Sequence, residues 1–266
     1  MKFSLGKWLL PTYVTLAFIF TMIPIGYTFV FSFNKVEKSN IAWKEFTFDN
    51  WLNMCGQPVV CEAFGNSVAI AIISTLISTA LGTAIAIALG RYKFKGRAAT
   101  NLLLFLPMAT PEVVMGAGLA AQFLNVGISK GFWTIVVGHA TFCVVIVHNN
   151  VVARLRRLPD RLWEASMDLG ADTLTTLRHI ILPQLGTALL AGGILAFALS
   201  VDELIVTTFT AGTDKTLPIW LMGQLGRPRE AAITNVVALV IMVITMPLIL
   251  LAWRLTREGD ASPNAR

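Results

Sequence analysis

Charged residues are scarce in this chain of 266 residues. Asp, Glu, Lys and Arg make up 14% of it, against roughly 25% in an ordinary soluble domain. Hydrophobic residues make up 55%, and the mean hydropathy is +0.69. Such a chain cannot cover a water-facing surface with polar groups, which excludes a soluble protein. Long apolar stretches between a few blocks of charge are typical of a polytopic membrane protein.

Cysteine is also rare. The three cysteines are too few for a disulfide framework and lack the spacing of a zinc site. Cys55 and Cys61 lie in one loop, where they either form a disulfide or remain free thiols. Cys143 lies in an apolar run and is expected to be a small packing residue. The net charge of +6 does not indicate nucleic-acid binding, because the basic residues alternate with apolar runs instead of forming one patch.

Two motifs that would give the chain a catalytic role are missing. It has no Gly-x-x-x-x-Gly-Lys-Ser/Thr phosphate loop, so any ATP hydrolysis has to come from another chain. It also has no His-Glu-x-x-His metalloprotease motif. His139 and His148 are nine residues apart, which does not stack them on one helix face as metal ligands, and a structural role is expected for each. An intramembrane enzyme and a passive channel or scaffold remain the alternatives to a transporter.

The apolar runs predict an all-α protein with six transmembrane helices in a single domain covering residues 1–266. A helix needs about 20 apolar residues to cross a bilayer, and each run is long enough. Only Glu112 interrupts the third run. The six predicted spans cover approximately residues 8–33, 64–90, 98–124, 131–153, 183–207 and 231–254. Small residues in them, as in Gly116-Ala117-Gly118 and Ala191-Gly192-Gly193, predict close helix packing.

The basic residues predict the orientation of these spans. Fourteen of the 21 lie in segments 1–7, 91–97, 154–178 and 254–266, which share one side of the membrane. Cytoplasmic loops carry the excess of Lys and Arg, so both termini are expected in the cytoplasm. The loop 34–62 and the connection 210–230 are then outside. The aromatic residues between Trp43 and Trp51 are expected either to pack on the helices or to contact a partner protein. Arg227 and Arg229 are expected either to remain solvated or to contact a partner protein.

The cytoplasmic loop 154–183 carries an amphipathic pattern. Pro159 and Asp160 favour the start of a helix, and Gly170 favours its end. Asp172 can cap a second short helix that is expected to stop before Pro183. A short helix of this kind suits a groove on a partner protein, and a solvated connecting loop is the equal alternative.

These residues carry a resemblance to a known family. The sequence Glu164-Ala165-Ser166, then Gly170, then Ile180-x-Leu182-Pro183 resembles the EAA signature of permease subunits of bacterial ATP-binding-cassette importers. Ser166 stands where a second Ala is usual. The resemblance implies a type I importer permease in which this loop forms coupling helices that dock into a cytoplasmic ATPase, on which ATP and Mg²⁺ bind. The ATPase-coupling residues would be Glu164, Ala165, Ser166, Gly170, Leu182 and Pro183, and this chain itself would hold no cofactor or metal.

Two acidic groups interrupt the apolar background. Glu112 lies in Pro107-Met108-Ala109-Thr110-Pro111-Glu112, where two prolines can open the helix around a cavity. Asp202 and Glu203 lie towards the outer end of the fifth span. An acid inside a membrane helix costs about 2.5–3.5 kcal/mol and usually faces a cavity or partner. Either these carboxylates bind a cation, or Glu112 is paired and the other two lie at the water interface.

The segments around these acids resemble spermidine/putrescine importer permeases over residues 66–250. The resemblance implies that Glu112, Asp202 and, more weakly, Glu203 bind a polyamine, with Glu112 replacing an acid that is often Asp. It also implies a place in the bacterial inner membrane, surrounded by lipid. The expected partners are two ATP-binding subunits, a second homologous permease and an extracytoplasmic solute-binding protein. Permeases of this family that carry another small solute are the alternative for the cargo.

Overall fold

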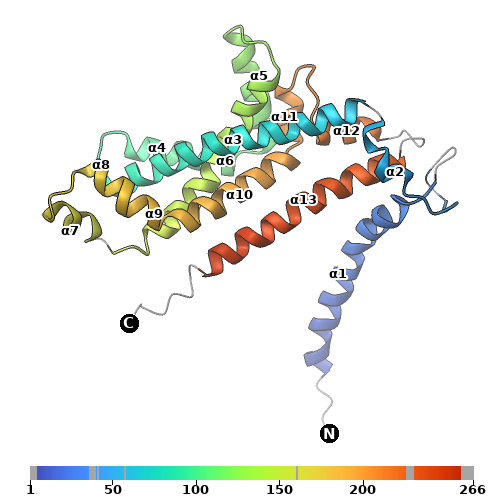
Figure 1. The fold of residues 1–266 in the computed structure, drawn as a ribbon, viewed down its shortest axis with the longest axis horizontal. Helices are drawn as coiled ribbons and strands as arrows, with labels where there is room; N and C mark the ends of the chain where they lie inside the picture. Colours follow the sequence, from blue (N-terminus) through green and yellow to red (C-terminus); the bar gives the residue numbers. More distant parts are fainter. Residues whose placement is uncertain are drawn as a thin grey trace. The chain divides into compact units, whose positions relative to one another are not determined.

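The computed structural model describes residues 5–35, 40, 42–56, 58–159, 161–225 and 231–258. Helices dominate this part of the chain (Figure 1), and an isolated antiparallel bridge joins Asn34 to Phe46. The helical class predicted from the apolar runs is thereby confirmed. Asp160, Arg227 and Arg229, for which the sequence suggested a helix start and a docking surface, lie outside the described residues.

Four of the described helices are long and apolar enough to cross a membrane. They are α1 (Leu5–Phe31), α3 (Pro58–Arg91), α6 (Phe132–Leu155) and α13 (Ala231–Glu258). Two bent pairs meet the same criteria when each is taken together. The first joins α4 (Arg97–Ala109) to α5 (Glu112–Asn125), and the second joins the segment Thr173–Gln184 to α10 (Gly186–Asp202). By length and composition, the described part of the chain therefore holds four to six spans.

The third predicted span is not one continuous helix. Its two halves, α4 and α5, meet at an angle of 116°. Thr110 between them has an extended backbone, with φ −91° and ψ 132°. The cause is Pro111, which has no N–H to donate and whose ring disfavours helical geometry for the residue before it.

The chain before α10 also differs from the expectation. The predicted stop before Pro183 is wrong, because α8 (Thr173–Thr176) continues through a π-helical stretch (Leu177–Ile181) into α9 (Leu182–Gln184). The wider π turn accommodates the missing N–H of Pro183, and the chain bends by 67° after it. The Nε of Arg154 donates to the carbonyl oxygen of Gln184 at 3.0 Å, which ties the end of α6 to this bend.

The fifth predicted span also ends earlier than expected. α10 stops at Asp202, and Glu203 has an extended backbone. Two shorter helices follow, α11 (Ile205–Thr210) and α12 (Leu217–Gln224). The carboxylate of Asp202 therefore lies at a helix end and that of Glu203 at a helix break, not within one long helix.

The described residues form two compact units. The larger belongs to Glu62–Trp220 and Val243–Arg266. Fully or almost fully buried side chains from α3, α6, the π-helical stretch and α10 form one of its core clusters: Ala86, Cys143, Val147, Val151, Ile181, Leu185 and Ala196. The buried thiol of Cys143 donates to the carbonyl oxygen of Ala196, so Cys143 is the packing residue that the sequence predicted.

Glycines let the helices of this unit approach closely. A Cβ added at Gly82 of α3 would lie 2.8 Å from the carbonyl oxygen of Val144 in α6. One added at Gly192 of α10 would lie 3.2 Å from the Cα of Val147. The close packing expected from the small residues is therefore present at these crossings.

The smaller unit belongs to Met1–Cys61 and Leu221–Met242. In the loop after α1, Phe33 packs against the rings of Phe46, Phe48 and Trp51, at centroid distances of 5.4 to 5.6 Å. The side chain of Asn50, in α2 (Asp49–Leu52), donates to the carbonyl oxygens of Ser32 and Asn34. The aromatic residues of this loop thus pack together.

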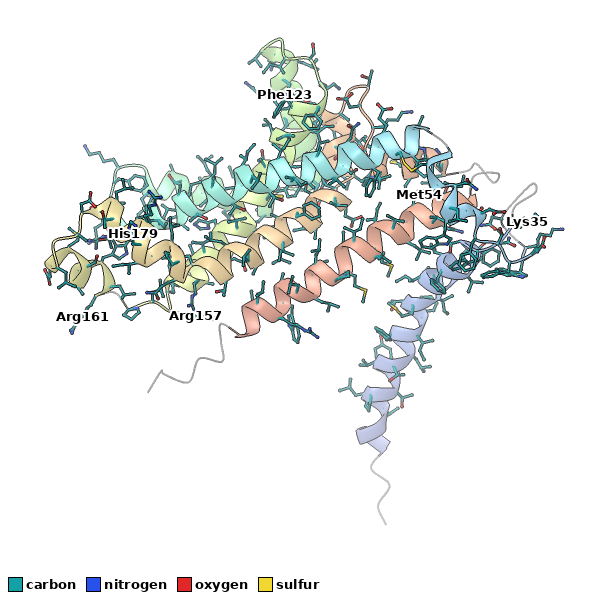
Figure 2. The ribbon with its side chains drawn as sticks, viewed as in Figure 1. Lys35, Met54, Phe123, Arg157, Arg161 and His179 are labelled. Atoms are coloured by element: carbon teal, nitrogen blue, oxygen red, sulfur yellow. A yellow bond between two sulfur atoms is a disulfide. The ribbon has the colours of Figure 1, made fainter. Side chains whose placement is uncertain are left out.

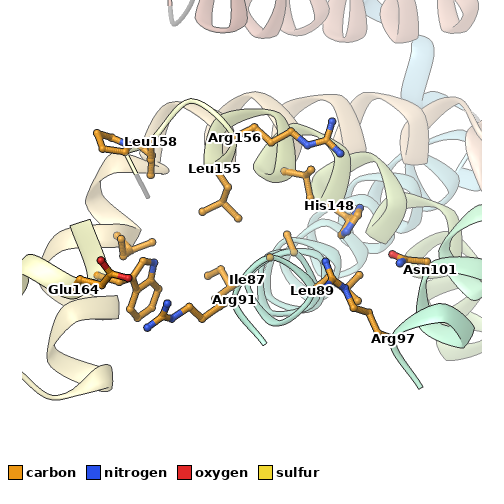
Figure 3. Close-up of a pocket in the computed structure, with 16 residues that line it drawn as sticks. Ile87, Leu89, Arg91, Arg97, Asn101, His148, Leu155, Arg156, Leu158 and Glu164 are labelled. Atoms are coloured by element: carbon orange, nitrogen blue, oxygen red, sulfur yellow. The ribbon is translucent and has the colours of Figure 1, made fainter. Parts of the chain in front are cut away.

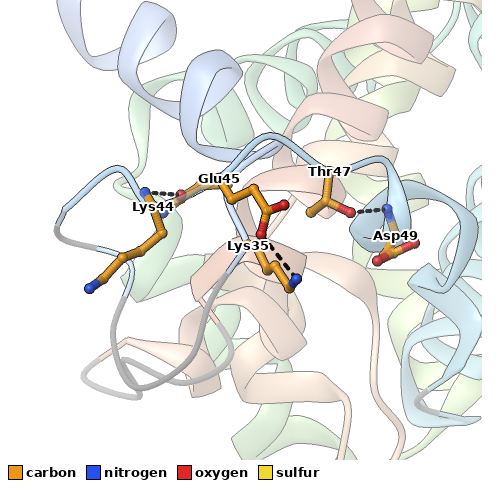
Figure 4. A network of polar contacts seen from close by, with 6 residues as sticks. Lys35, Lys44, Glu45, Thr47 and Asp49 are labelled. Atoms are coloured by element: carbon orange, nitrogen blue, oxygen red, sulfur yellow. Dashed lines mark hydrogen bonds and ion pairs between the residues drawn. The ribbon is translucent and has the colours of Figure 1, made fainter.

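Polar contacts hold the same loop. Lys35 and Glu45 form an exposed ion pair at 3.0 Å, and Thr47 accepts a hydrogen bond from the backbone N–H of Asp49 (Figure 4). Cys55 and Cys61 form a disulfide with a Cα–Cα distance of 5.4 Å, near Met54 in Figure 2. Of the two possibilities left open by the sequence, the disulfide is the one found.

Candidate functional site

The predicted coupling residues lie on and after the short helix α7 (Leu162–Asp168). The helix begins two residues beyond the predicted start at Asp160. Glu164 and Ala165 are exposed, whereas Ser166 is buried. Gly170 has φ +88°, a left-handed conformation that favours glycine, and its N–H donates to the carbonyl oxygen of Met167. The predicted helix end at Gly170 is confirmed.

A pair of hydroxyls joins α7 to α8. Ser166 Oγ and Thr176 Oγ1 lie 2.8 Å apart and are buried. Because Thr176 donates its one proton to the carbonyl oxygen of Asp172, Ser166 must be the donor of the pair. The serine that replaces the usual alanine therefore joins the two helices by a hydrogen bond. Thr176 could not be predicted as its partner, because nothing in the sequence distinguishes it from the other threonines.

Asp172 caps α8 as predicted. Its Oδ1 accepts a hydrogen bond from the backbone N–H of Thr175 at 2.8 Å. Hydrogen bonds from Thr175 to the charged carboxylate hold the pKa of Asp172 below its ordinary value of 3.8. The cap is therefore ionised and in place at neutral pH.

The two sides of this helical turn have different surroundings. Leu162 and Trp163 pack against the core cluster that contains Ala86 and Cys143, so α7 is attached to the long helices of the larger unit. Leu169 and Leu174 are 90% and 69% exposed. Because the packing of Leu162 and Trp163 holds the turn in place, the exposed Leu169 and Leu174 form an apolar surface suited to a protein partner. The remaining predicted coupling residues, Leu182 and Pro183, lie in the bent segment that precedes α10. Leu182 is half-buried and Pro183 is exposed.

Glu112 lies in the first turn of α5, directly after the break at Pro111, and is exposed. The predicted span 98–124 is thus broken directly before Glu112, which begins a helix instead of lying within one. Negative charge in the first turn of a helix is favoured by the helix dipole, which lowers the cost of keeping a carboxylate there.

Asp202 and Glu203 lie at the break between α10 and α11. Asp202 is exposed and Glu203 is half-buried. One oxygen of Glu203 accepts a hydrogen bond from the backbone N–H of Val206 at 2.8 Å. Glu203 therefore caps α11, a role that was not predicted from the sequence.

The structure brings the two acidic groups together. Glu203 interacts electrostatically with both Glu112 and Asp202. α5 packs against α11, where Gly116 allows the ring of Phe209 to approach its backbone closely, and this packing places the two acidic groups near one another. No ion pair of these three acids with a basic residue occurs within the described part of the chain. The site is a group of acids whose like charges no basic side chain of the described residues balances.

A buried polar network supports the break that carries Asp202 and Glu203. His139 of α6 contacts Ser200 through Nδ1 and Thr207 through Nε2, both at 2.7 Å. Thr207 donates to the carbonyl oxygen of Glu203, so the Nε2 of His139 is the protonated nitrogen and donates to Thr207. His139 therefore links α6 to the helices on both sides of the break, which is the structural role predicted for it.

The chain also contains a Gly-x-Ser-x-Gly sequence, Gly127-Ile128-Ser129-Lys130-Gly131. In hydrolases this pattern places a nucleophile on a sharp turn from a strand to a helix. Here it forms the loop between α5 and α6, two helices. The loop lacks the structural context of a nucleophile elbow.

Residues 80–257 match the family described as binding-protein-dependent transport system inner membrane component. Over 249 residues, the chain is 33% identical to the spermidine/putrescine transport system permease protein PotC of Haemophilus influenzae. The aligned part covers 93% of this chain and 96% of the relative. It is 28% identical over 253 residues to the putrescine transport system permease protein PotI of Escherichia coli, covering 92% and 89%.

Solved structures share the fold. A bacterial ABC transporter involved in the import of the acidic polysaccharide alginate aligns with a TM-score of 0.67 over 95% of this chain and 96% of that one, at 13% identity. The MetNI methionine ABC transporter aligns with a TM-score of 0.63 over 76% and 98%, at 15% identity. The chain belongs to the family of binding-protein-dependent transport system inner membrane components and is a permease subunit of an ATP-binding-cassette importer.

Proposed function

We propose that this permease carries a polyamine and that Glu112, Asp202 and Glu203 bind its ammonium groups. The main support is that three acids approach one another, from the start of α5 and from the break between α10 and α11, and that none of them pairs with a basic residue of the described chain. The names of the PotC and PotI relatives support the same class of cargo.

The proposal follows from the electrostatics of the group. Carboxylates that repel one another lose that repulsion when a cation lies between them, and the gain is larger where water is partly excluded. No three His, Cys, Asp or Glu side chains of the described residues are grouped closely enough to hold a metal ion. Acids spaced in this way suit a flexible chain with several ammonium groups, each of which forms a charge-assisted hydrogen bond.

We also propose the arrangement of the chain in the bacterial inner membrane. Each bent pair counts as one span, which makes six spans within one transmembrane domain, with both termini in the cytoplasm. The distribution of basic residues supports this orientation. The acids at the outer end of α10 then face the extracytoplasmic side, and α7 and α8 lie in the cytoplasm.

Importer permeases of this family work with a second permease, a substrate-binding protein and an ATPase. We propose that α7 and α8 of this chain form the surface on which the ATPase docks, and that ATP and Mg²⁺ bind to two copies of that subunit. The exposed Leu169 and Leu174 support this assignment. The substrate-binding protein would then approach from the opposite side and deliver the polyamine to the acidic group.

Charge-neutral variants test the cation site. In the complete complex, Glu112→Gln and Asp202→Asn each remove one charged hydrogen bond, so the KM for polyamine uptake is expected to rise about tenfold or more. Glu62→Gln, which removes an exposed acid of α3 outside the group, is the matched control and should leave the KM unchanged. Unchanged polyamine uptake in the assembled Glu112 and Asp202 variants would refute the assignment of these acids as the cation site.

A further inference from the structure

A pocket of about 560 Å³ lies in the larger unit, where α3 and α6 end and α4 begins. Its apolar wall includes Ile87, Leu89 and Leu155, and its polar wall includes three arginines (Figure 3). A volume of this size accommodates a small organic ligand. The pocket is at the opposite end of α10 from the acidic group, so it is a separate site.

The charge of the pocket is strongly unbalanced. Arg91, Arg97 and Arg156 line it together with one acid, Glu164. None of the three arginines forms an ion pair with an acid of the described chain. Arg91 instead lies over the ring of Trp163, with its guanidinium carbon 5.4 Å from the ring centroid. The pocket therefore has guanidinium donors that no residue of the described chain neutralises.

The polar groups gather on one side. In Figure 3, His148, Asn101 and Arg97 lie on the side opposite Glu164, and Arg156 extends towards His148. His148 contacts Asn149 through Nδ1, but its Nε2 is buried without a hydrogen-bond partner in the described chain. An unpartnered buried nitrogen costs stability unless a ligand or water meets it. This side of the pocket thus presents the guanidinium groups of Arg97 and Arg156 and the amide of Asn101, whose side chains form no hydrogen bond within the described chain.

We propose that this pocket binds a phosphate group, held by Arg97 and Arg156 beside Asn101 and His148. Guanidinium groups match phosphate oxygens in geometry and charge, and arginine is the side chain most suited to this recognition. The positive charge excludes the cationic cargo proposed above, so the ligand is not the transported solute.

Two sources can supply this phosphate. One is the headgroup of an anionic phospholipid, whose glycerol and first methylene groups would contact Ile87, Leu89 and Leu155; basic pockets between cytoplasmic helix ends commonly bind such headgroups. The other is a soluble phosphate compound of the cytoplasm. The proposed orientation decides which leaflet the pocket faces, but the pocket itself does not depend on it. A ligand here would also contact α7 through Trp163 and Glu164.

The experiment measures ligand binding to the purified complete complex. Phosphatidylglycerol is titrated in detergent and its bound copies are counted by native mass spectrometry, with phosphatidylcholine and inorganic phosphate titrated separately. The double variant Arg97→Gln with Arg156→Gln is expected to weaken phosphatidylglycerol binding about tenfold or more, because two charged contacts are lost. Its matched control is Lys93→Gln with Lys95→Gln, which removes the same charge from the neighbouring loop without altering the pocket wall.

A second variant makes the result independent of the stability of the first. Asn101→Asp keeps the shape of an exposed side chain but places a negative charge in the pocket, and it should weaken binding in the same way. Loss in the pocket variants with retention in the lysine control supports the site and identifies a lipid source. Arginine-dependent binding of inorganic phosphate alone supports the site with a soluble source. Equal loss in pocket and control variants, or no binding of either probe, overturns the proposal.

Discussion

The packing of α5 against α11 positions Glu112 near Glu203. Replacing Gly116 by alanine adds one methyl group at this contact and tests the packing. A Cβ at Gly116 would lie 2.7 Å from Cδ2 and 3.3 Å from Cβ of Phe209, so alanine must displace the ring. Two residues further along the same helix, a Cβ at Gly118 would have nothing within 4 Å. Both substitutions gain about the same helix propensity, close to 1 kcal/mol. Their difference in stability therefore isolates the overpacking, which costs about 1–3 kcal/mol.

Thermal unfolding of the two purified variant complexes measures this difference. A change of 1 kcal/mol shifts the Tm of a chain of this size by about 2–4 °C, so Gly116→Ala is expected to unfold several degrees below Gly118→Ala. Because Glu112 lies one turn before Gly116 on the same helix, the KM for uptake should also rise in Gly116→Ala alone. Equal Tm and equal KM in the two variants would show that α5 and α11 are not packed as described.

Three further predictions concern the coupling helices and the buried network. Gly170→Val places a β-branched residue at φ +88° and strains the turn by about 1–2 kcal/mol, so it should reduce uptake per ATP hydrolysed. Gly96→Val, at φ +100° with open space around it and outside α7 and α8, should not, and equal effects would refute the docking role. His139→Leu leaves two buried hydroxyls without their partner and should lower stability by about 2 kcal/mol or more, and an unchanged Tm would contradict the network. Because the folded-state pKa of Asp172 is lowered, its charged cap contributes fully above the ordinary pKa of 3.8 and is lost as the pH falls through the lowered value. The stability advantage of the native chain over Asp172→Asn should therefore disappear on acidification, and a pH-independent difference would contradict the assignment.

The helical class and the turn at Gly170 were predictable from local sequence. Apolar runs of membrane length specify helices, and a glycine after an amphipathic turn specifies a left-handed helix end. The cap by Asp172 followed from the same local chemistry. These features depend on residues close together in the chain, so one sequence is sufficient to find them.

The rest depends on residues far apart in the chain. Pro111 was recognised as able to open a helix, but the angle of 116° between α4 and α5 also depends on what α5 packs against. Pro183 was expected to stop a helix, yet a π-helical stretch carries the chain through it. The approach of Glu112 to Glu203 requires the contact between Gly116 and Phe209, which lie 93 positions apart by their numbers in the sequence. No local pattern encodes these pairings.

The most direct test of whether this permease carries a polyamine is polyamine-dependent ATP turnover in the reconstituted complex. The permease is assembled with its partner permease, ATPase and substrate-binding protein in lipid vesicles, and ATP hydrolysis is measured with and without spermidine or putrescine on the side of the binding protein. We expect a polyamine to accelerate hydrolysis, and we expect Glu112→Gln, but not Glu62→Gln, to raise the polyamine concentration that is required. ATP hydrolysis that no polyamine stimulates, in a complex that a different solute activates, would contradict it.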